Sequence, residues 1–154
     1  MKIGTMNPKD TISGQLAECF ITIDNERIYF MQAETVTAKI NKQKADISIM
    51  GKTCKGKKTT GWSGTGTAKF FYGFPIFRDM IKKYKDTGKD IYFDMQITNE
   101  DPTSDVGRQT IILKNCNLDG ITLAQFDVNA DVLEEEADFT FEDFEIPEKF
   151  ARLN

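Results

Sequence analysis

Two short segments of this 154-residue chain place side chains in the pattern of ligand-binding loops. Gly51-Lys52-Thr53 matches the end of a phosphate-binding loop, in which backbone amides and a lysine hold the phosphate. The first glycine of that motif falls on Asp46, whose carboxylate would repel phosphate, and no helical pattern follows. Gly64-Thr65-Gly66 lacks the third glycine of a dinucleotide fingerprint and leads into a predicted strand. We therefore reject both as nucleotide sites.

Asp127, Asn129 and Asp131 have the spacing of the first three ligands of a calcium loop. The turn glycine of that loop would fall on Val132, and its final glutamate on Asp138. The pattern leaves room for a weak cation site at most, and we expect no functional metal centre.

Catalytic chemistry is limited by the absence of histidine, the commonest general base and zinc ligand. Cys19, Cys54 and Cys116 are odd in number and far apart, which excludes a disulfide framework or a metal-binding pair. Cys19 and Cys116 are predicted to be small buried hydrophobic residues. Carboxylates are numerous, but no pattern places two of them in an apolar cleft. We expect neither an enzyme nor a cofactor-binding protein.

Charge is distributed very unevenly. Residues 39–58 carry seven lysines against one acid, whereas residues 127–148 carry ten acids and neither lysine nor arginine. Two blocks of opposite sign are suited to a subunit that associates with copies of itself, although two solvated faces are the alternative. Glu134-Glu135-Glu136 is typical of a solvated turn. The net charge of −4 argues against a general nucleic-acid-binding protein.

The length predicts a single domain over residues 1–154 with one core. No apolar run approaches the roughly 18 residues of a membrane helix, and the first residues lack the apolar region of a secretion signal. We expect the chain to stay in the cytoplasm until it assembles.

Strand patterns dominate the elements that must position these charges. Alternation predicts strands at 16–24, 27–40, 62–72, 91–97, 108–116, 121–128 and 139–146. The parity changes at Glu142-Asp143, which predicts a bend there. Gly64 and Gly66 share one strand face and indicate a bulge or the close approach of another backbone.

One helix is predicted at about 75–87, with Pro75 in its first turn and Gly88 after its end. Its apolar stripe comprises Ile76, Phe77, Met80, Ile81 and Tyr84. We place Arg78 with the lysines on the opposite, solvated side of this helix.

The segment from Lys52 to Thr60 has almost no apolar residues and is predicted to be a solvated arm or long loop. With the preceding lysines it forms a projecting arm or hairpin at about 39–60. It has too few apolar residues to fold on itself, so a neighbouring molecule would order it. The polar loop 99–107 is predicted to be mobile.

Several short motifs occur in a fixed order along the chain. They are Asp10-Thr11-Ile12-Ser13-Gly14, Ile49-Met50-Gly51, Lys58-Thr59-Thr60-Gly61, Gly64-Thr65-Gly66-Thr67, Leu133-Glu134-Glu135-Glu136, Phe139-Thr140-Phe141-Glu142-Asp143-Phe144 and Ile146-Pro147-Glu148-Lys149. Together they resemble the tail tube protein of contractile-tailed phages and phage-tail-like particles, in the group typified by the defective Bacillus prophage PBSX. The resemblance runs end to end, although residues 70–118 match only in pattern and Trp62 lies outside it.

The resemblance implies a mainly β, antiparallel sandwich or barrel-like fold with one flanking helix. It implies hexameric rings stacked into the inner tube of a contractile tail, a conduit for DNA or a puncturing tube. The implied partners are further copies, the tail sheath, the baseplate or tube initiator, and the tail terminator, with DNA passing unbound and no membrane. Family members use no cofactor and reside in the host cytoplasm during assembly, then in the virion or particle.

The predicted subunit interface joins the basic arm to the acidic region 127–148. Its residues are Lys52, Lys55, Lys57, Lys58, Trp62, Glu134, Glu135, Glu136, Glu142 and Asp143. The lysines are expected at subunit contacts and away from the channel, because each phosphate contact would make passing DNA adhere. The alternatives are a monomeric module that grips nucleic acid with Lys39–Lys58, and an adaptor at the tail terminus.

Overall fold

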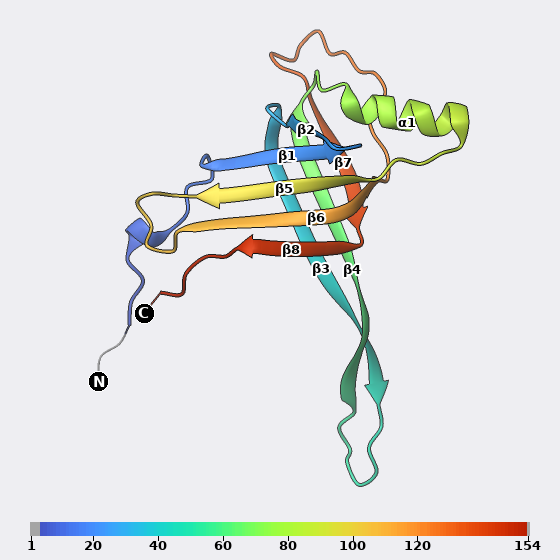
Figure 1. The fold of residues 1–154 in the computed structure, drawn as a ribbon. Coiled ribbons are helices and arrows are strands. Elements are labelled where there is room, and N and C mark those ends of the chain that lie inside the picture. The colour runs from blue at the N-terminus through green and yellow to red at the C-terminus, as the bar shows by residue number, and fades with distance from the viewer. Residues whose placement is uncertain (1–3, 154) are drawn as a thin grey trace. The chain divides into compact units, whose positions relative to one another are not determined.

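A computed structural model describes residues 4–153 of the chain, which form antiparallel strands and a single α-helix (Figure 1). This confirms the predicted mainly β class. The chain groups into two compact units, each assembled from segments that are distant in sequence. Unit 1 contains residues 4–31, 92–116 and 143–153, and unit 2 contains residues 32–91 and 117–142. The single domain over residues 1–154 stays a prediction.

Unit 1 is an antiparallel sheet in the strand order β2-β1-β5-β6-β8. Its strands are β1 (Ala17–Ile23), β2 (Glu26–Tyr29), β5 (Phe93–Glu100), β6 (Arg108–Leu118, whose last two residues belong to unit 2) and β8 (Asp143–Glu148). Asp24 and Asn25 join β1 to β2 with φ values of 49° and 66°, as a two-residue hairpin turn requires. Ile21 and Met95 are completely buried in its core.

The amino-terminal segment of unit 1 is fastened to the loop 101–107. Asp10 ends a short 3₁₀ turn (Pro8–Asp10) and is only 8% exposed. Its carboxylate accepts a hydrogen bond from the Asp105 amide (2.9 Å), and its carbonyl accepts one from the Ser104 hydroxyl (2.9 Å). The loop predicted to be mobile is therefore fixed by hydrogen bonds to a segment about 90 residues earlier in the sequence.

This fastening is predicted to weaken in acid. The hydrogen bond from the Asp105 amide, followed by the Lys9 side chain, lowers the pKa of Asp10 below its ordinary 3.8. A lowered folded-state pKa contributes stability above the unfolded value, and this contribution is lost as pH falls through the folded value. The carboxyl carbon resonance of Asp10 should therefore titrate with a midpoint below 3.8. Asp10→Asn should remove this titrating resonance and so confirm its assignment, whereas Asp86→Asn on the helix should leave it unchanged; a midpoint above 3.8 would contradict the prediction.

Unit 2 is built from β3 (Ala33–Ile47), β4 (Gly56–Phe71), β7 (Glu134–Phe141) and α1 (Ile76–Thr87). The antiparallel order is β7-β4-β3, and Asn117 and Leu118 at the end of β6 pair with β7. The predicted helix is confirmed, and Gly88 ends it in the left-handed conformation (φ 73°). Phe77 of α1 packs edge-to-face on Phe70 of β4, with ring centroids 5.6 Å apart.

Gly64 and Gly66 make room for two aromatic rings on the facing strand. Gly64 lies opposite Phe141 and Gly66 opposite Phe139 in the β4–β7 ladder. A Cβ atom on Gly66 would stand 2.3 Å from the Phe139 ring, and one on Gly64 would stand 2.4 Å from the Phe141 ring. The glycines therefore accommodate rings, whereas the sequence pattern suggested a bulge or a backbone.

Gly66→Ala is accordingly expected to destabilise the protein. The Phe139 ring is 1% exposed, so it must be displaced within a packed core, which costs about 1–3 kcal/mol. Chemical denaturation would measure the change in the free energy of unfolding. Gly120→Ala is the matched control, because a Cβ atom there meets no atom within 4 Å. Equal stability of the two variants would refute the steric role of Gly66.

Three predicted elements differ from the structure. The strand predicted over 27–40 is interrupted between β2 and β3, and residues 121–128 lie in a loop (119–133) between β6 and β7. Glu134, Glu135 and Glu136 begin β7 and do not form a turn. The predicted bend is confirmed, since β7 ends at Phe141 and β8 begins at Asp143.

Candidate assembly surface

The outer part of the β3–β4 hairpin, residues 39–60, is a two-stranded ribbon that we call the arm. β7 pairs with β4 only from Gly64 to Phe71, so the arm has no third strand within the described residues (Figure 1). Its side chains are exposed on both faces, apart from the half-buried Ala45. The prediction that the arm cannot fold on itself was wrong for its backbone, because a ladder from Lys39 to Ile47 orders it. A two-stranded hairpin is nevertheless marginal alone, so the arm is suited to gaining a partner.

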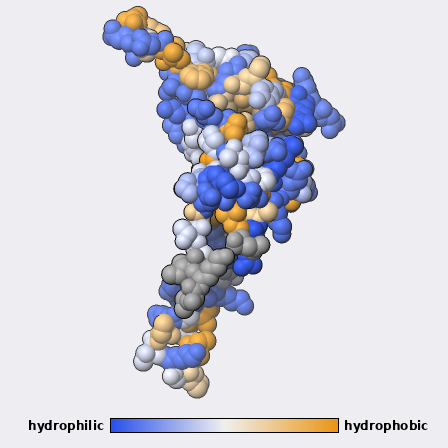
Figure 2. All heavy atoms as spheres, turned by 90° about the vertical axis from the view of Figure 1, so that its left-hand side faces the viewer, coloured by the Kyte–Doolittle hydropathy of each residue, from blue (hydrophilic) through white to orange (hydrophobic). Residues whose placement is uncertain are grey.

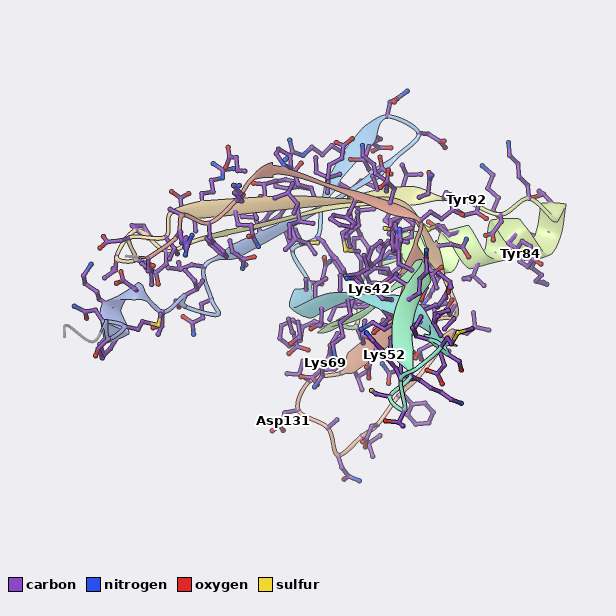
Figure 3. All side chains as sticks on the ribbon, turned by 90° about the horizontal axis from the view of Figure 1, so that it is seen from below. Lys42, Lys52, Lys69, Tyr84, Tyr92 and Asp131 are labelled. Atoms are coloured by element: carbon purple, nitrogen blue, oxygen red, sulfur yellow. The ribbon has the colours of Figure 1, made fainter. Side chains whose placement is uncertain are left out.

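The predicted lysines lie at the far end of the arm. Lys52 and Lys55 are on the turn between β3 and β4, and Lys57 and Lys58 are on β4. Lys57 pairs with Asp46 across the ribbon. Within residues 4–153, the other three lysines form no ion pair. Figure 3 labels one of these three lysines, Lys52. The charges of Lys52, Lys55 and Lys58 are therefore available to a second molecule.

Trp62 stands where the arm meets the body of unit 2. It faces Lys42 across the ladder, and its ring centroid lies 6.4 Å from that of Phe141. Trp62 is 40% exposed, which leaves apolar surface beside Lys42. β3 is the last strand of this sheet in the described structure, and its outer edge can accept a further strand.

The acidic residues predicted for the interface divide into different environments. Glu134 pairs with Lys69 at 3.2 Å, which raises the pKa of Lys69. Burial, and then the neighbouring Glu134, raise the pKa of Glu34. Glu136 faces Lys69 across the β4–β7 ladder and is exposed. Glu34, Glu134 and Glu136 thus lie around Lys69 of their own chain.

Glu135 was predicted to lie at the subunit interface, and the structure contradicts this prediction. It is 5% exposed and lies opposite Phe70, on the buried face of β7. The Glu135 carboxylate pairs with Arg78 of α1. The prediction that Arg78 lies on the solvated side of the helix was therefore also wrong. Glu135 is therefore a structural residue within the subunit, and a neighbouring arm cannot reach it while the fold is intact.

Arg78 connects four parts of unit 2, and the sequence analysis missed this role. Its Nη1 donates to the Phe74 carbonyl (2.9 Å) and its Nε to the Leu123 carbonyl (3.3 Å). Its Nη2 donates to Glu135, and the guanidinium carbon lies 4.6 Å from the centre of the Tyr72 ring. The side chain is 20% exposed. Arg78 thus fixes α1 and the loop 119–133 against β7.

Glu142 and Asp143 mark the end of unit 2 and the start of β8 in unit 1. The Asp143 carboxylate accepts a hydrogen bond from the Phe144 amide at 2.8 Å. Asp143 lies opposite Lys114 in the β6–β8 ladder. Their role at a subunit interface remains a prediction.

Among the groups considered for chemistry, Asp127 shapes a turn and two of the three cysteines are buried. Asp127 accepts a hydrogen bond from the Asn129 amide at 3.0 Å, so the calcium-like spacing forms a turn. Burial raises the pKa values of Cys19 and Cys116 to about 12, while Cys54 is exposed on the arm. In the part of the chain that the structure covers, no cluster of acidic, cysteine and histidine residues could hold a metal ion. The same residues contain no helix that is long and apolar enough to cross a bilayer.

The fold is similar to that of strand-rich proteins in solved structures of an injection system and a phage tail. One chain in the structure of the sheath–tube complex of an extracellular contractile injection system has a similar fold, with a TM-score of 0.61 at 15% identity. The match covers 83% of this chain and 86% of that chain. The SPP1 tail tube structure shares it with a TM-score of 0.63 at 10% identity, covering 88% and 78%.

The chain belongs to the family of phage tail tube proteins, which matches residues 4–148. It is 37% identical over 146 residues to protein XkdM of the phage-like element PBSX from Bacillus subtilis, covering 95% of this chain and 97% of that protein. The family predicted from the ordered motifs is thereby confirmed. The protein is a structural subunit of a phage tail tube.

Proposed function

We propose that copies of this chain close into hexameric rings, and that the rings stack into the inner tube of a contractile tail. The observation that supports this most strongly is the arm, a lysine-rich ribbon exposed on both faces with a terminal strand edge beside it. Exposed edges must be paired or protected, and a closed ring pairs them all. The proposed role is mechanical, with neither an enzymatic activity nor a cofactor.

The channel is proposed to pass DNA without binding it. One face of the unit 2 sheet carries Thr37, Thr65 and Thr67, with Lys39 opposite Thr65, and the Thr67 hydroxyl donates to Asp138 at 2.9 Å. This face is therefore polar but includes a cation, so it does not by itself distinguish passage of DNA from retention. The net charge of −4 is what supports passage over retention.

The further partners proposed are the sheath, the baseplate or tube initiator, and the terminator, each of which would contact an assembled tube. Subunits would accumulate in the host cytoplasm and then enter the virion or tail-like particle. The monomeric nucleic-acid-binding module, our alternative from the sequence, has only the charge of the arm in its favour.

Electron microscopy tests the proposal directly. Purified full-length protein is concentrated and examined by negative staining, and we expect rings or hollow tubes. An anisotropy titration with DNA at low salt accompanies it. Dispersed single particles that bind DNA would overturn the tube proposal in favour of the nucleic-acid-binding module.

A further inference from the structure

The tip of the arm, residues 47–55, combines apolar and basic side chains. Ile47, Ile49 and Met50 are 37%, 46% and 99% exposed. The turn is defined by a hydrogen bond from the Lys52 amide to the Ile49 carbonyl (3.1 Å) and by the left-handed Gly51 (φ 81°). The tip lies at the bottom of the view in Figure 2, where hydrophobic residues stand beside hydrophilic ones. The tip thus presents exposed apolar side chains together with two lysines, Lys52 and Lys55.

The loop 119–133, which we call the acidic loop, has the complementary composition. It contains three aspartates and neither lysine nor arginine, and Figure 3 labels one of them, Asp131. Four of its large apolar side chains are unusually exposed: Leu123 71%, Phe126 86%, Val128 88% and Val132 61%. These side chains contribute little to the core of their own subunit, so another surface is needed to cover them.

The acidic loop is held in place although its apolar side chains face solvent. Arg78 donates to the Leu123 carbonyl, and the Gln125 side chain donates to the Glu134 carbonyl at 2.7 Å. The Ala130 amide closes a turn onto the Asp127 carbonyl at 3.2 Å. A surface that is ordered before it binds loses less conformational entropy on association. The loop therefore has the properties of a preformed docking surface.

A single chain cannot bring the tip and the acidic loop together. The tip precedes β4, whereas Phe71 at the end of β4 pairs with Glu134, directly after the loop. The 16 residues of β4 span about 50 Å, so the tip and the Glu134 end of the loop lie at opposite ends of this strand. Figure 1 shows the tip and the loop at opposite ends of the β3–β4 hairpin. Any contact between them must therefore join two copies.

We propose that the tip of one copy docks on the acidic loop of a second copy. Met50, Ile49 and Ile47 would cover the exposed apolar residues of the loop, and Lys52 and Lys55 would face the loop aspartates. An apolar centre with an oppositely charged rim is the usual composition of a specific interface. Because the two surfaces differ, the contact is heterologous and extends from copy to copy. The inference rests on the proposed tube and assigns one of its contacts.

Disulfide trapping in assembled tubes tests this contact. Cys54→Ser removes the exposed thiol, and Cys19 and Cys116 are buried. In that background, Met50→Cys and Val128→Cys are made in separate chains of different size, which are mixed, assembled and oxidised. We expect covalent heterodimers and few homodimers, because a disulfide requires Cα atoms within about 7 Å. Tubes of either variant alone should remain largely uncross-linked.

Microscopy of the same samples separates this inference from the proposed function. Tubes without heterodimers, or with homodimers predominating, would overturn the docking of tip on loop while leaving the tube intact. If neither single-cysteine variant assembled, Val128→Ser and Gln96→Ser would be compared in the natural background. The inference requires that only the loop variant lose long tubes, and equal assembly of both would overturn it. Absence of tubes from the unmodified protein would instead refute the proposed function.

Discussion

Replacing Lys55, Lys57 and Lys58 by glutamate should stop tube formation while leaving the subunit folded. The substitutions convert the basic end of the arm to an acidic one, so it would repel the acidic surfaces of neighbouring copies. Stability should change little, because the side chains are exposed and the pair lost, Lys57 with Asp46, is a surface pair worth at most about 1 kcal/mol. Negative-stain microscopy reports assembly, and circular dichroism with chemical denaturation reports folding.

The helix supplies a matched control for this triple variant. Lys82, Lys83 and Lys85 of α1 are also on the surface, and changing them to glutamate alters the net charge by the same amount. We expect this control to assemble into tubes of ordinary length. Full-length tubes from the arm variant, or loss of tubes in both variants, would show that the arm lysines have no specific role in assembly.

Arg78→Ala should be the most destabilising single substitution proposed for this chain. It leaves the Glu135 carboxylate buried without its cation, and breaking a buried pair in this way costs about 3–5 kcal/mol. It also removes the donors to Phe74 and Leu123, so α1 and the acidic loop lose a common anchor. Denaturation would measure the lost free energy of unfolding, and assembly should fail at the same time.

Two further variants identify the cause of that loss. Arg78→Lys retains the charge but not the planar set of donors, and it should recover only part of the stability. Lys82→Ala, one turn further along α1, breaks only the exposed pair with Asp86 and should change the free energy of unfolding by less than about 0.5 kcal/mol. A similar loss from Lys82→Ala and Arg78→Ala would refute the role given to the buried pair.

Features that depend on neighbouring residues could be predicted from the sequence. The helix followed from its apolar stripe, Pro75 and Gly88, and the bend from the parity change at Glu142. Alternation along β7 carried a further signal that we did not use. Glu135 has the same parity as Ala137, Phe139 and Phe141, which are all buried.

Features that depend on distant partners could not be predicted in this way. Arg78 appeared to be a surface residue because Glu135, which neutralises it, lies 57 positions later in the sequence. Gly64 and Gly66 accommodate rings only because the β4–β7 register places phenylalanines opposite them. Residues 121–128 alternate like a strand, yet they form a loop in which Leu123, Phe126 and Val128 remain exposed. The environment of these residues is set by strand pairing and by contacts with residues that are distant in the sequence.

The lysines of β3 have a second physical consequence. A long terminal strand invites identical strands to add side by side without limit, which is how amyloid-like fibres grow. Lys39, Lys42 and Lys44 would bring like charges together in such stacks, and this repulsion discourages them. The β3 lysines are therefore expected to act as gatekeepers that protect a newly made subunit from aggregation at high concentration before it assembles.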